Sequence, residues 1–139
     1  MRILGLDYGS KRIGVALCDE LGITAQGLTT ITRKNRTADL EAITELVRTH
    51  RVEKIVIGYP VRLDGSEGIQ CEKVNRFIRL LEEACSIPVI RYDETLSTQH
   101  AQDILSQANV RGARRRKIID KLAACLILQG YLDSLSGGK

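Results

Sequence analysis

Short apolar runs separated by polar turns divide the first quarter of the chain into three predicted strands. The runs cover residues 2–6, 12–18 and 23–33, and a Gly-Ser turn joins the first two. Strands that follow one another across short turns pair with antiparallel neighbours. The pattern therefore predicts an antiparallel meander at the start of the chain.

The pattern changes to a helical period after residue 37. Apolar residues then recur three or four positions apart as far as Val47, and Thr37 or Asp39 is available as the start signal of a helix. A nearly continuous apolar run at 54–58 predicts a strand that is buried on both faces. A further strand is predicted at 86–92.

Three more helices are predicted in the second half of the chain. One ends near residue 84 and follows Asp64 and Glu67, whose spacing is that of a capping box. The next begins at 93 and ends near 108, and the last extends from about 117 to 135, before a Gly-Gly pair. Residues 109–117, NVRGARRRK, are predicted to form a loop.

Three strands followed by alternating helices and strands indicate an α/β fold. In such folds a mixed sheet is covered by helices on both faces. The length of 139 residues suits one hydrophobic core. Since no linker or repeat interrupts the pattern, residues 1–139 are predicted to form a single domain.

Composition narrows the range of partners. Aromatic residues make up 4% of the chain and Trp is absent, which argues against a surface on which single-stranded bases stack. The net charge of +4 is compatible with a nucleic-acid partner.

The compartment is predicted from what the sequence lacks. Cysteines stand at 18, 71, 85 and 125, without a C-x-x-C spacing, so each is expected to be a reduced thiol. The apolar start is broken too early for a signal peptide. No apolar stretch approaches the roughly 20 residues of a membrane span. We expect a cytoplasmic protein with no membrane partner.

Carboxylates follow apolar strands at the points where catalytic groups often lie. Asp7 ends the first strand, Asp93 and Glu94 end the last, and Asp120 lies on the face of the final helix that carries alanines. Acidic groups that converge repel one another unless a cation lies between them. Oxygen ligands suit Mg²⁺ or Mn²⁺ above other metals.

Each acidic residue also has an ordinary structural interpretation. Asp7 can form an Asx-turn before Gly9. Asp93 can cap a helix, and Asp120 can interact with the positive end of its helix. The joint occurrence of these residues at strand ends favours the metal site.

Four motifs in this order resemble the YqgF/RuvX family of RNase H-like nucleases. They are LGLDYGSKRIGVA, GYPVRLDG, DETLST and DKLAACLILQGYLD, and together they cover nearly the whole chain. The resemblance implies an RNase H-like fold with a five-stranded mixed sheet. Its strand order would be 3-2-1-4-5, with strand 2 antiparallel and helices on both faces.

The resemblance also implies divalent-metal-dependent cleavage of nucleic acid. The implied role is maturation of the 5′ end of pre-16S ribosomal RNA, and the alternative is resolution of Holliday junctions in branched DNA. By position, the catalytic acids would be Asp7, Glu94 and Asp120, with Asp93 beside them, and the first three would bind Mg²⁺ or Mn²⁺. Thr95 stands where the family usually has arginine, so the grip on the substrate is in question.

Basic residues and a glycine-rich loop complete the predicted site. Gly58, Pro60 and Gly65 shape a loop at a strand end, where backbone N–H groups can meet a phosphate. Basic side chains after the first turn and before the final helix are predicted to contact nucleic acid. These are Lys11, Arg12, Arg111, Arg114, Arg115, Arg116 and Lys117.

Other classes of protein remain possible from the sequence. The segment DYGSKRIG also resembles the phosphate-binding hairpin of actin-like ATPases, which need a second domain. A non-catalytic RNA-binding assembly or transcription factor could keep this fold. Junction resolution requires two symmetric cuts and hence a dimer. The expected state is a monomer or a weak homodimer.

Overall fold

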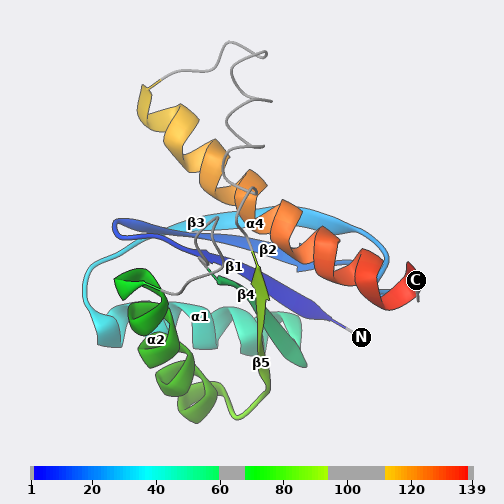
Figure 1. Cartoon of the computed structure of the whole chain (residues 1–139), viewed down its shortest axis with the longest axis horizontal. Coiled ribbons are helices and arrows are strands. Elements are labelled where there is room, and N and C mark those ends of the chain that lie inside the picture. The colour runs from blue at the N-terminus through cyan, green and yellow to red at the C-terminus, as the bar shows by residue number, and fades with distance from the viewer. Residues whose placement is uncertain (1, 60–67, 94–111, 138–139) are drawn as a thin grey trace.

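A computed structural model describes residues 2–59, 68–93 and 112–137 and centres on one five-stranded sheet (Figure 1). Its order is β3-β2-β1-β4-β5, where β2 is antiparallel to β1 and β3, and β1, β4 and β5 are parallel. The predicted mixed sheet and its order are confirmed. The strands are β1 (Ile3–Tyr8), β2 (Arg12–Cys18), β3 (Ala25–Thr32), β4 (Lys54–Tyr59) and β5 (Val89–Asp93).

Helices cover both faces of the sheet, as predicted (Figure 1). On one face lie α1 (Arg36–His50) and α2 (Ile69–Cys85). On the other lies α4 (Gly112–Gly137), which crosses β3, β2 and β1. The first turns of α4 project beyond the sheet in Figure 1, and the Thr30 hydroxyl donates a hydrogen bond to the carbonyl of Lys117 (3.0 Å) near the point where the helix meets β3.

Alternation along the strands separates two hydrophobic cores. In β1, Leu4 and Leu6 pack towards α1 and α2, whereas Ile3 packs against α4. Because successive side chains of a strand point to opposite faces, Gly5 and Asp7 share the α4 face with Ile3. The polar end of β1 is therefore turned towards the last helix.

Glycines in the strands let α4 lie unusually close to the sheet. A Cβ atom at Gly5 would lie 2.8 Å from the Cβ of Leu128, and one at Gly14 would overlap the carbonyl oxygen of Asp120. Ala123 and Ala124 on the helix are fully buried. The predicted close approach is correct, but the strand glycines contribute to it as much as the alanines.

Some predicted boundaries are wrong for physical reasons. The loop expected over 109–117 is helical from Gly112, because Arg and Lys are good helix formers. Helix α1 begins after Asn35, whose side chain accepts a hydrogen bond from the Ala38 N–H (2.9 Å). The strand expected from residue 23 begins at 25, because Asp19 accepts hydrogen bonds from the backbone of residues 23 and 24. The Asp64–Glu67 capping box and the helix predicted over 93–108 lie outside the described residues, apart from position 93, which ends β5.

All four cysteines are free thiols, as predicted; Cys18 and Cys71 are buried, and Cys85 and Cys125 are half-buried. In the part of the chain that the structure describes, no helix has the length and hydropathy of a membrane span.

Candidate functional site

Asp7 lies near the end of β1, half-buried on the face that α4 covers. In the antiparallel ladder its Cα partner is Gly14 of β2. The absence of a side chain at Gly14 leaves open the space beside Asp7 on that face. The strand thus holds a carboxylate on a rigid backbone, at the edge of a packed core.

Asp120 enters this space from α4. Its carbonyl oxygen lies so close to the Gly14 Cα that no larger residue would fit there. Since Gly14 is the ladder partner of Asp7, this contact brings two acidic residues from distant parts of the sequence to the same corner of the sheet. The prediction that Asp120 faces inward is supported, because its side chain is 16% exposed.

Arg12 lies two residues before Gly14 in β2 and forms an ion pair with Asp120. Its Nε donates to Asp120 Oδ2 over 2.5 Å, and the Arg12 side chain is 24% exposed. Arg12 was expected to contact nucleic acid. In the structure its guanidinium is directed to the carboxylate of a candidate metal ligand.

The pairing of β5 with β4 places Asp93 apart from the other acids. Asp93 is the register partner of Tyr59, which packs in the core beneath α1 and α2. Neighbouring residues in a ladder share a face, so Asp93 lies on the face opposite Asp7. Glu94 and Thr95 lie outside the described residues, and their roles stay predictions.

The donor chemistry of the corner fits a hard divalent cation. Asp7 and Asp120 offer carboxylate oxygens, the ligands that Mg²⁺ and Mn²⁺ prefer. Burial raises the pKa of the Cys125 thiol, which packs against the hydrophobic core beneath α4. Within residues 2–59, 68–93 and 112–137, no three His, Cys, Asp or Glu side chains converge. Glu94, the predicted third ligand, lies outside the described residues, so its contribution stays a prediction.

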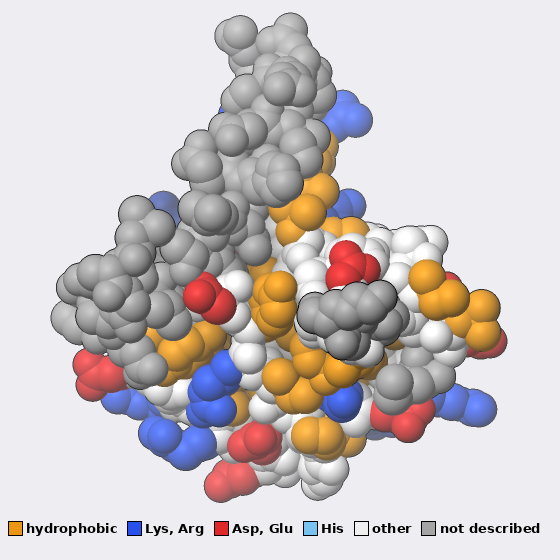
Figure 2. Space-filling model, turned by 45° about the vertical axis from the view of Figure 1, so that its right-hand side comes forward, with side chains coloured by type: hydrophobic (Ala, Val, Ile, Leu, Met, Phe, Trp, Pro, Cys, Tyr) orange, Lys and Arg blue, Asp and Glu red, His pale blue; other side chains and the backbone are white. Residues whose placement is uncertain are grey.

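The predicted basic residues lie at two places. Lys11 and Arg12 lie in the β1–β2 turn and at the start of β2, where Lys11 is exposed, and four others lie on the first turns of α4. Figure 2 shows Lys and Arg side chains at the upper right of the molecule and, separately, along the lower part of the view. The exposed members on α4 are Arg114, Arg116 and Lys117; Arg115 is half-buried, and Arg111 lies outside the described residues.

The predicted phosphate loop is described only at its start. Gly58 is buried near the end of β4, beside Tyr92 of β5 in the ladder. Pro60 and Gly65 lie outside the described residues. Their contact with phosphate stays a prediction.

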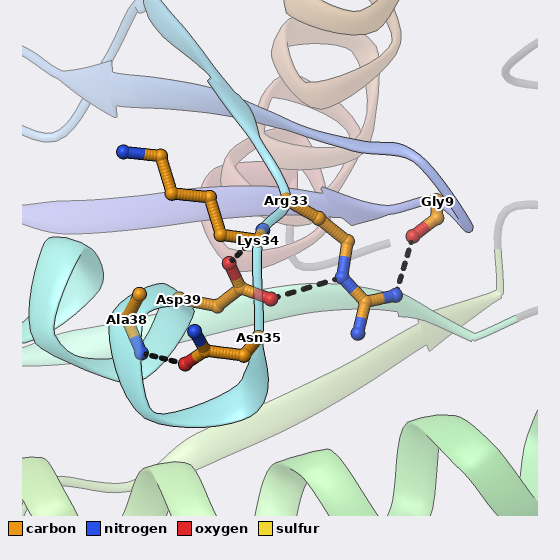
Figure 3. A network of polar contacts seen from close by, with 6 residues as sticks. All are labelled: Gly9, Arg33, Lys34, Asn35, Ala38 and Asp39. Carbon is orange, nitrogen blue, oxygen red and sulfur yellow. Dashed lines mark hydrogen bonds and ion pairs between the residues drawn. The ribbon is translucent and has the colours of Figure 1, made fainter.

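Sequence reasoning missed a polar network on the opposite face, shown in Figure 3. Asp39 is only 2% exposed, and it accepts hydrogen bonds from Arg33 Nε (3.1 Å) and from the Lys34 N–H (3.1 Å). Arg33 also donates from Nη1 to the carbonyl of Gly9 (3.0 Å). The network ties the β1–β2 turn to the start of α1. In the sequence this network is indicated only by Asp39, and an acid so close to the start of a helix has a simpler explanation as a start signal.

Comparison with known proteins agrees with this geometry. A family model described as RuvX, Holliday junction resolvase, matches residues 1–134. The chain is 66% identical to the "Putative pre-16S rRNA nuclease" of Syntrophus aciditrophicus (strain SB), over 100% of this chain and 93% of that protein. It is 53% identical to the protein of the same name from Moorella thermoacetica (strain ATCC 39073 / JCM 9320), over 97% and 96% of the two chains.

Solved structures with the same fold include two resolvases. T. thermophilus RuvC in complex with Holliday junction substrate has 15% identity and a TM-score of 0.57, over 99% of this chain and 96% of that one. Fowlpox virus resolvase with its substrate Holliday junction DNA has 14% identity and a TM-score of 0.60, over 97% and 99%. At this identity the likeness concerns the fold alone, which is RNase H-like.

Proposed function

Because the chain belongs to the RuvX family, whose members are nucleases, we propose that it is a divalent-metal-dependent endonuclease that processes the 5′ end of pre-16S ribosomal RNA. The name of the 66% identical relative supports this substrate. Such a substrate implies action in the cytoplasm. The observation that carries the proposal is the close approach of the Asp120 backbone to Gly14, which is the ladder partner of Asp7.

The chain's own residues would hold the metal. Asp7 on β1 and Asp120 on α4 are anchored by regular structure, so neither carboxylate has to be ordered when the substrate arrives. Glu94 is the proposed third ligand. When bound, Mg²⁺ or Mn²⁺ stabilises the attacking and leaving oxygens of a phosphodiester displacement.

Arg12 has a positioning role in this proposal. Its ion pair with Asp120 fixes the direction of one carboxylate and offsets one negative charge in the acidic corner. The pair also fastens α4 to β2. In this proposal Arg12 acts through Asp120 and does not itself contact the reacting phosphate.

The first turns of α4 supply a basic surface for the substrate. Three exposed cations lie within about one turn of α4 and precede Asp120 by about one to two turns. Lys and Arg side chains bind phosphates mainly through charge and counterion release. This surface would deliver the nucleic-acid backbone to the acidic corner.

Resolution of Holliday junctions is the second candidate. The description of the family model and the fold shared with RuvC favour it. Two symmetric cuts require two active sites, so this activity demands a homodimer. Solution mass at working concentration separates a monomer from a dimer.

Cleavage assays test both candidates. The purified chain would be incubated with Mn²⁺ or with EDTA, using a transcript that carries the pre-16S 5′ segment and a synthetic four-way junction. We expect Mn²⁺-dependent cleavage of the transcript, lost in Asp7→Asn and in Asp120→Asn. Glu41→Gln removes one exposed carboxylate on α1 and serves as the matched control. Binding without cleavage under all metal conditions would favour a non-catalytic RNA-binding role instead.

A further inference from the structure

A pocket of about 320 Å³ opens on the side of the β1–β2 turn that faces away from α4. Its floor contains Tyr8 and Phe77, whose rings stack with centroids 4.3 Å apart. Gly9 and Ser10 of the turn form one wall. Apart from Val74, the remaining lining is basic and comes from two separate parts of the chain, with Arg33 and Arg36 before and at the start of α1 and Lys73 and Arg76 on α2.

Within the part of the chain that the structure describes, most of the cations of this pocket have no ion-pair partner. Asp39 pairs with Arg33. Arg36, Lys73 and Arg76 take part in none of the ion pairs formed among the described residues. Like charges that converge on a pocket repel one another, so their gathering calls for an anionic ligand or for full exposure to water.

Arg33 gives the pocket a fixed donor. Its guanidinium is held by Asp39 and the Gly9 carbonyl and lies over the Tyr8 ring, 4.5 Å from the centroid. Nε and Nη1 are thereby used, and Nη2 makes no hydrogen bond among the residues drawn in Figure 3. Since the side chain is already immobilised, a ligand would bind without the entropic cost of ordering it.

The pocket lies on the other side of the turn from the acidic corner. Asp7 faces α4, whereas the next residue, Tyr8, faces the pocket. The β1–β2 turn therefore stands between the candidate metal ligands and a basic cavity. An extended polyanion that passes over the turn can occupy both, which a single free anion cannot.

We propose that this pocket binds a backbone phosphate of the nucleic-acid substrate, away from the phosphodiester that is cut. The inference rests on the proposed nuclease function and adds a second contact surface to it. The contact lies on the α1–α2 side and is separate from the basic turns of α4. A substrate that is bound on both sides of the β1–β2 turn would cross the acidic corner in one orientation.

The test compares two triple variants of equal charge. One carries Arg36→Gln, Lys73→Gln and Arg76→Gln in the pocket, and the control carries Lys34→Gln, Arg48→Gln and Arg79→Gln on exposed positions outside it. Binding of the labelled transcript and of the four-way junction is followed by fluorescence anisotropy in EDTA, over a series of salt concentrations. Arg33 is left unchanged because its loss would leave the buried Asp39 carboxylate without its ion-pair partner.

We expect the pocket variant to lose about 0.7–0.9 in the slope of log affinity against log salt for each phosphate contact removed. The control should keep the wild-type slope, and both should melt at the wild-type temperature. Equal slopes in the two variants would overturn the pocket proposal while leaving the nuclease function intact. Failure of the wild-type chain to bind either nucleic acid would instead overturn the proposed function, and the pocket proposal with it.

One further arm distinguishes a free anion from the nucleic acid. Stabilisation of the wild type by inorganic phosphate is measured by thermal melting, beside the same measurement on the pocket variant. If the variant loses that stabilisation but keeps the nucleic-acid salt slope, the pocket binds small anions, and the proposal is wrong.

Discussion

Arg12 and Asp120, which are 108 positions apart in the sequence, form an ion pair between β2 and α4 with a 2.5 Å contact from Nε to Oδ2. Both side chains are largely shielded from water, at 24% and 16% exposure. The pair joins the sheet to the helix that carries a candidate metal ligand. The coupling energy of this ion pair can be measured without an activity assay.

A double-mutant cycle with Arg12→Ala and Asp120→Ala should give a coupling energy of about 1–2 kcal/mol, because the charged hydrogen bond is partly buried. Urea denaturation of the four proteins measures it. The exposed pair Arg48–Glu45, whose side chains are 70% and 66% exposed, is the control and should couple by only about 0.3 kcal/mol. Equal couplings would mean that the Arg12–Asp120 contact is no stronger than a surface pair.

Replacing Gly14 by alanine should disturb the packing of α4. The added methyl group would overlap the Asp120 carbonyl, so the helix or β2 must shift, at a cost of about 1–3 kcal/mol. Cleavage should fall further than stability does, since Asp120 moves with the helix. In the matched variant Gly27→Ala the new Cβ would lie 3.4 Å from the Lys121 Cβ, and this change should be much milder. Melting curves and cleavage rates of both variants make the comparison.

Asp7→Asn should separate metal binding from folding. The variant keeps the shape of the side chain but removes one charge from the acidic corner, so the metal-free protein should melt at the wild-type temperature or slightly above it. Mn²⁺ should raise the melting temperature of the wild type, because it binds the native state, and should raise that of the variant much less. A variant that melts far lower without metal yet still cuts RNA would show that Asp7 is only a structural turn residue.

The exposed cations on α4 should govern affinity. The triple change Arg114→Gln, Arg116→Gln and Lys117→Gln is expected to reduce the salt slope of nucleic-acid binding by about 0.7–0.9 per lost phosphate contact. Anisotropy titrations measure the slope, with the same exposed control triple as for the pocket. An unchanged slope would identify this part of α4 as solvated surface without a role in binding.

Asp19 should make the stability of the chain depend on pH. Hydrogen bonds from the Ile23 and Thr24 N–H groups lower the pKa of its carboxyl, so the native state favours the ionised form. The stabilisation is fully present above the pKa of the unfolded chain, about 4. It is lost as pH falls through the lower pKa of the folded chain. Asp19→Asn should flatten the acid limb of a stability–pH curve measured by urea denaturation, and an identical limb in both proteins would exclude this contribution.

The sequence predicted the fold well because its signals are local. The apolar run at 12–18 matches β2 without error, and the buried run from 54 matches β4 to within one residue. Strand alternation also places Asp7 on the face that α4 covers. These features depend on neighbouring residues, which a single sequence displays directly.

The features that were missed depend on residues far apart in the sequence. The Arg12 side chain could serve equally as a nucleic-acid contact or as a partner of Asp120, and only tertiary packing decides between them. In the sequence alone Gly14 is an ordinary strand residue, and its role becomes visible only where α4 packs against it. The Arg33–Asp39 network likewise joins a strand end, a turn and a helix start, none of which is unusual alone.

The contact between Gly14 and Asp120 bears on when the enzyme becomes active during its own synthesis. The chain emerges from the ribosome N-terminus first, so the strands that carry Asp7 and Gly14 appear long before α4 does. A nascent chain that ends before Asp120 has the sheet but an incomplete pair of acids. The acidic corner is therefore complete only after α4, the last helix of the chain, has been made and has packed against β2.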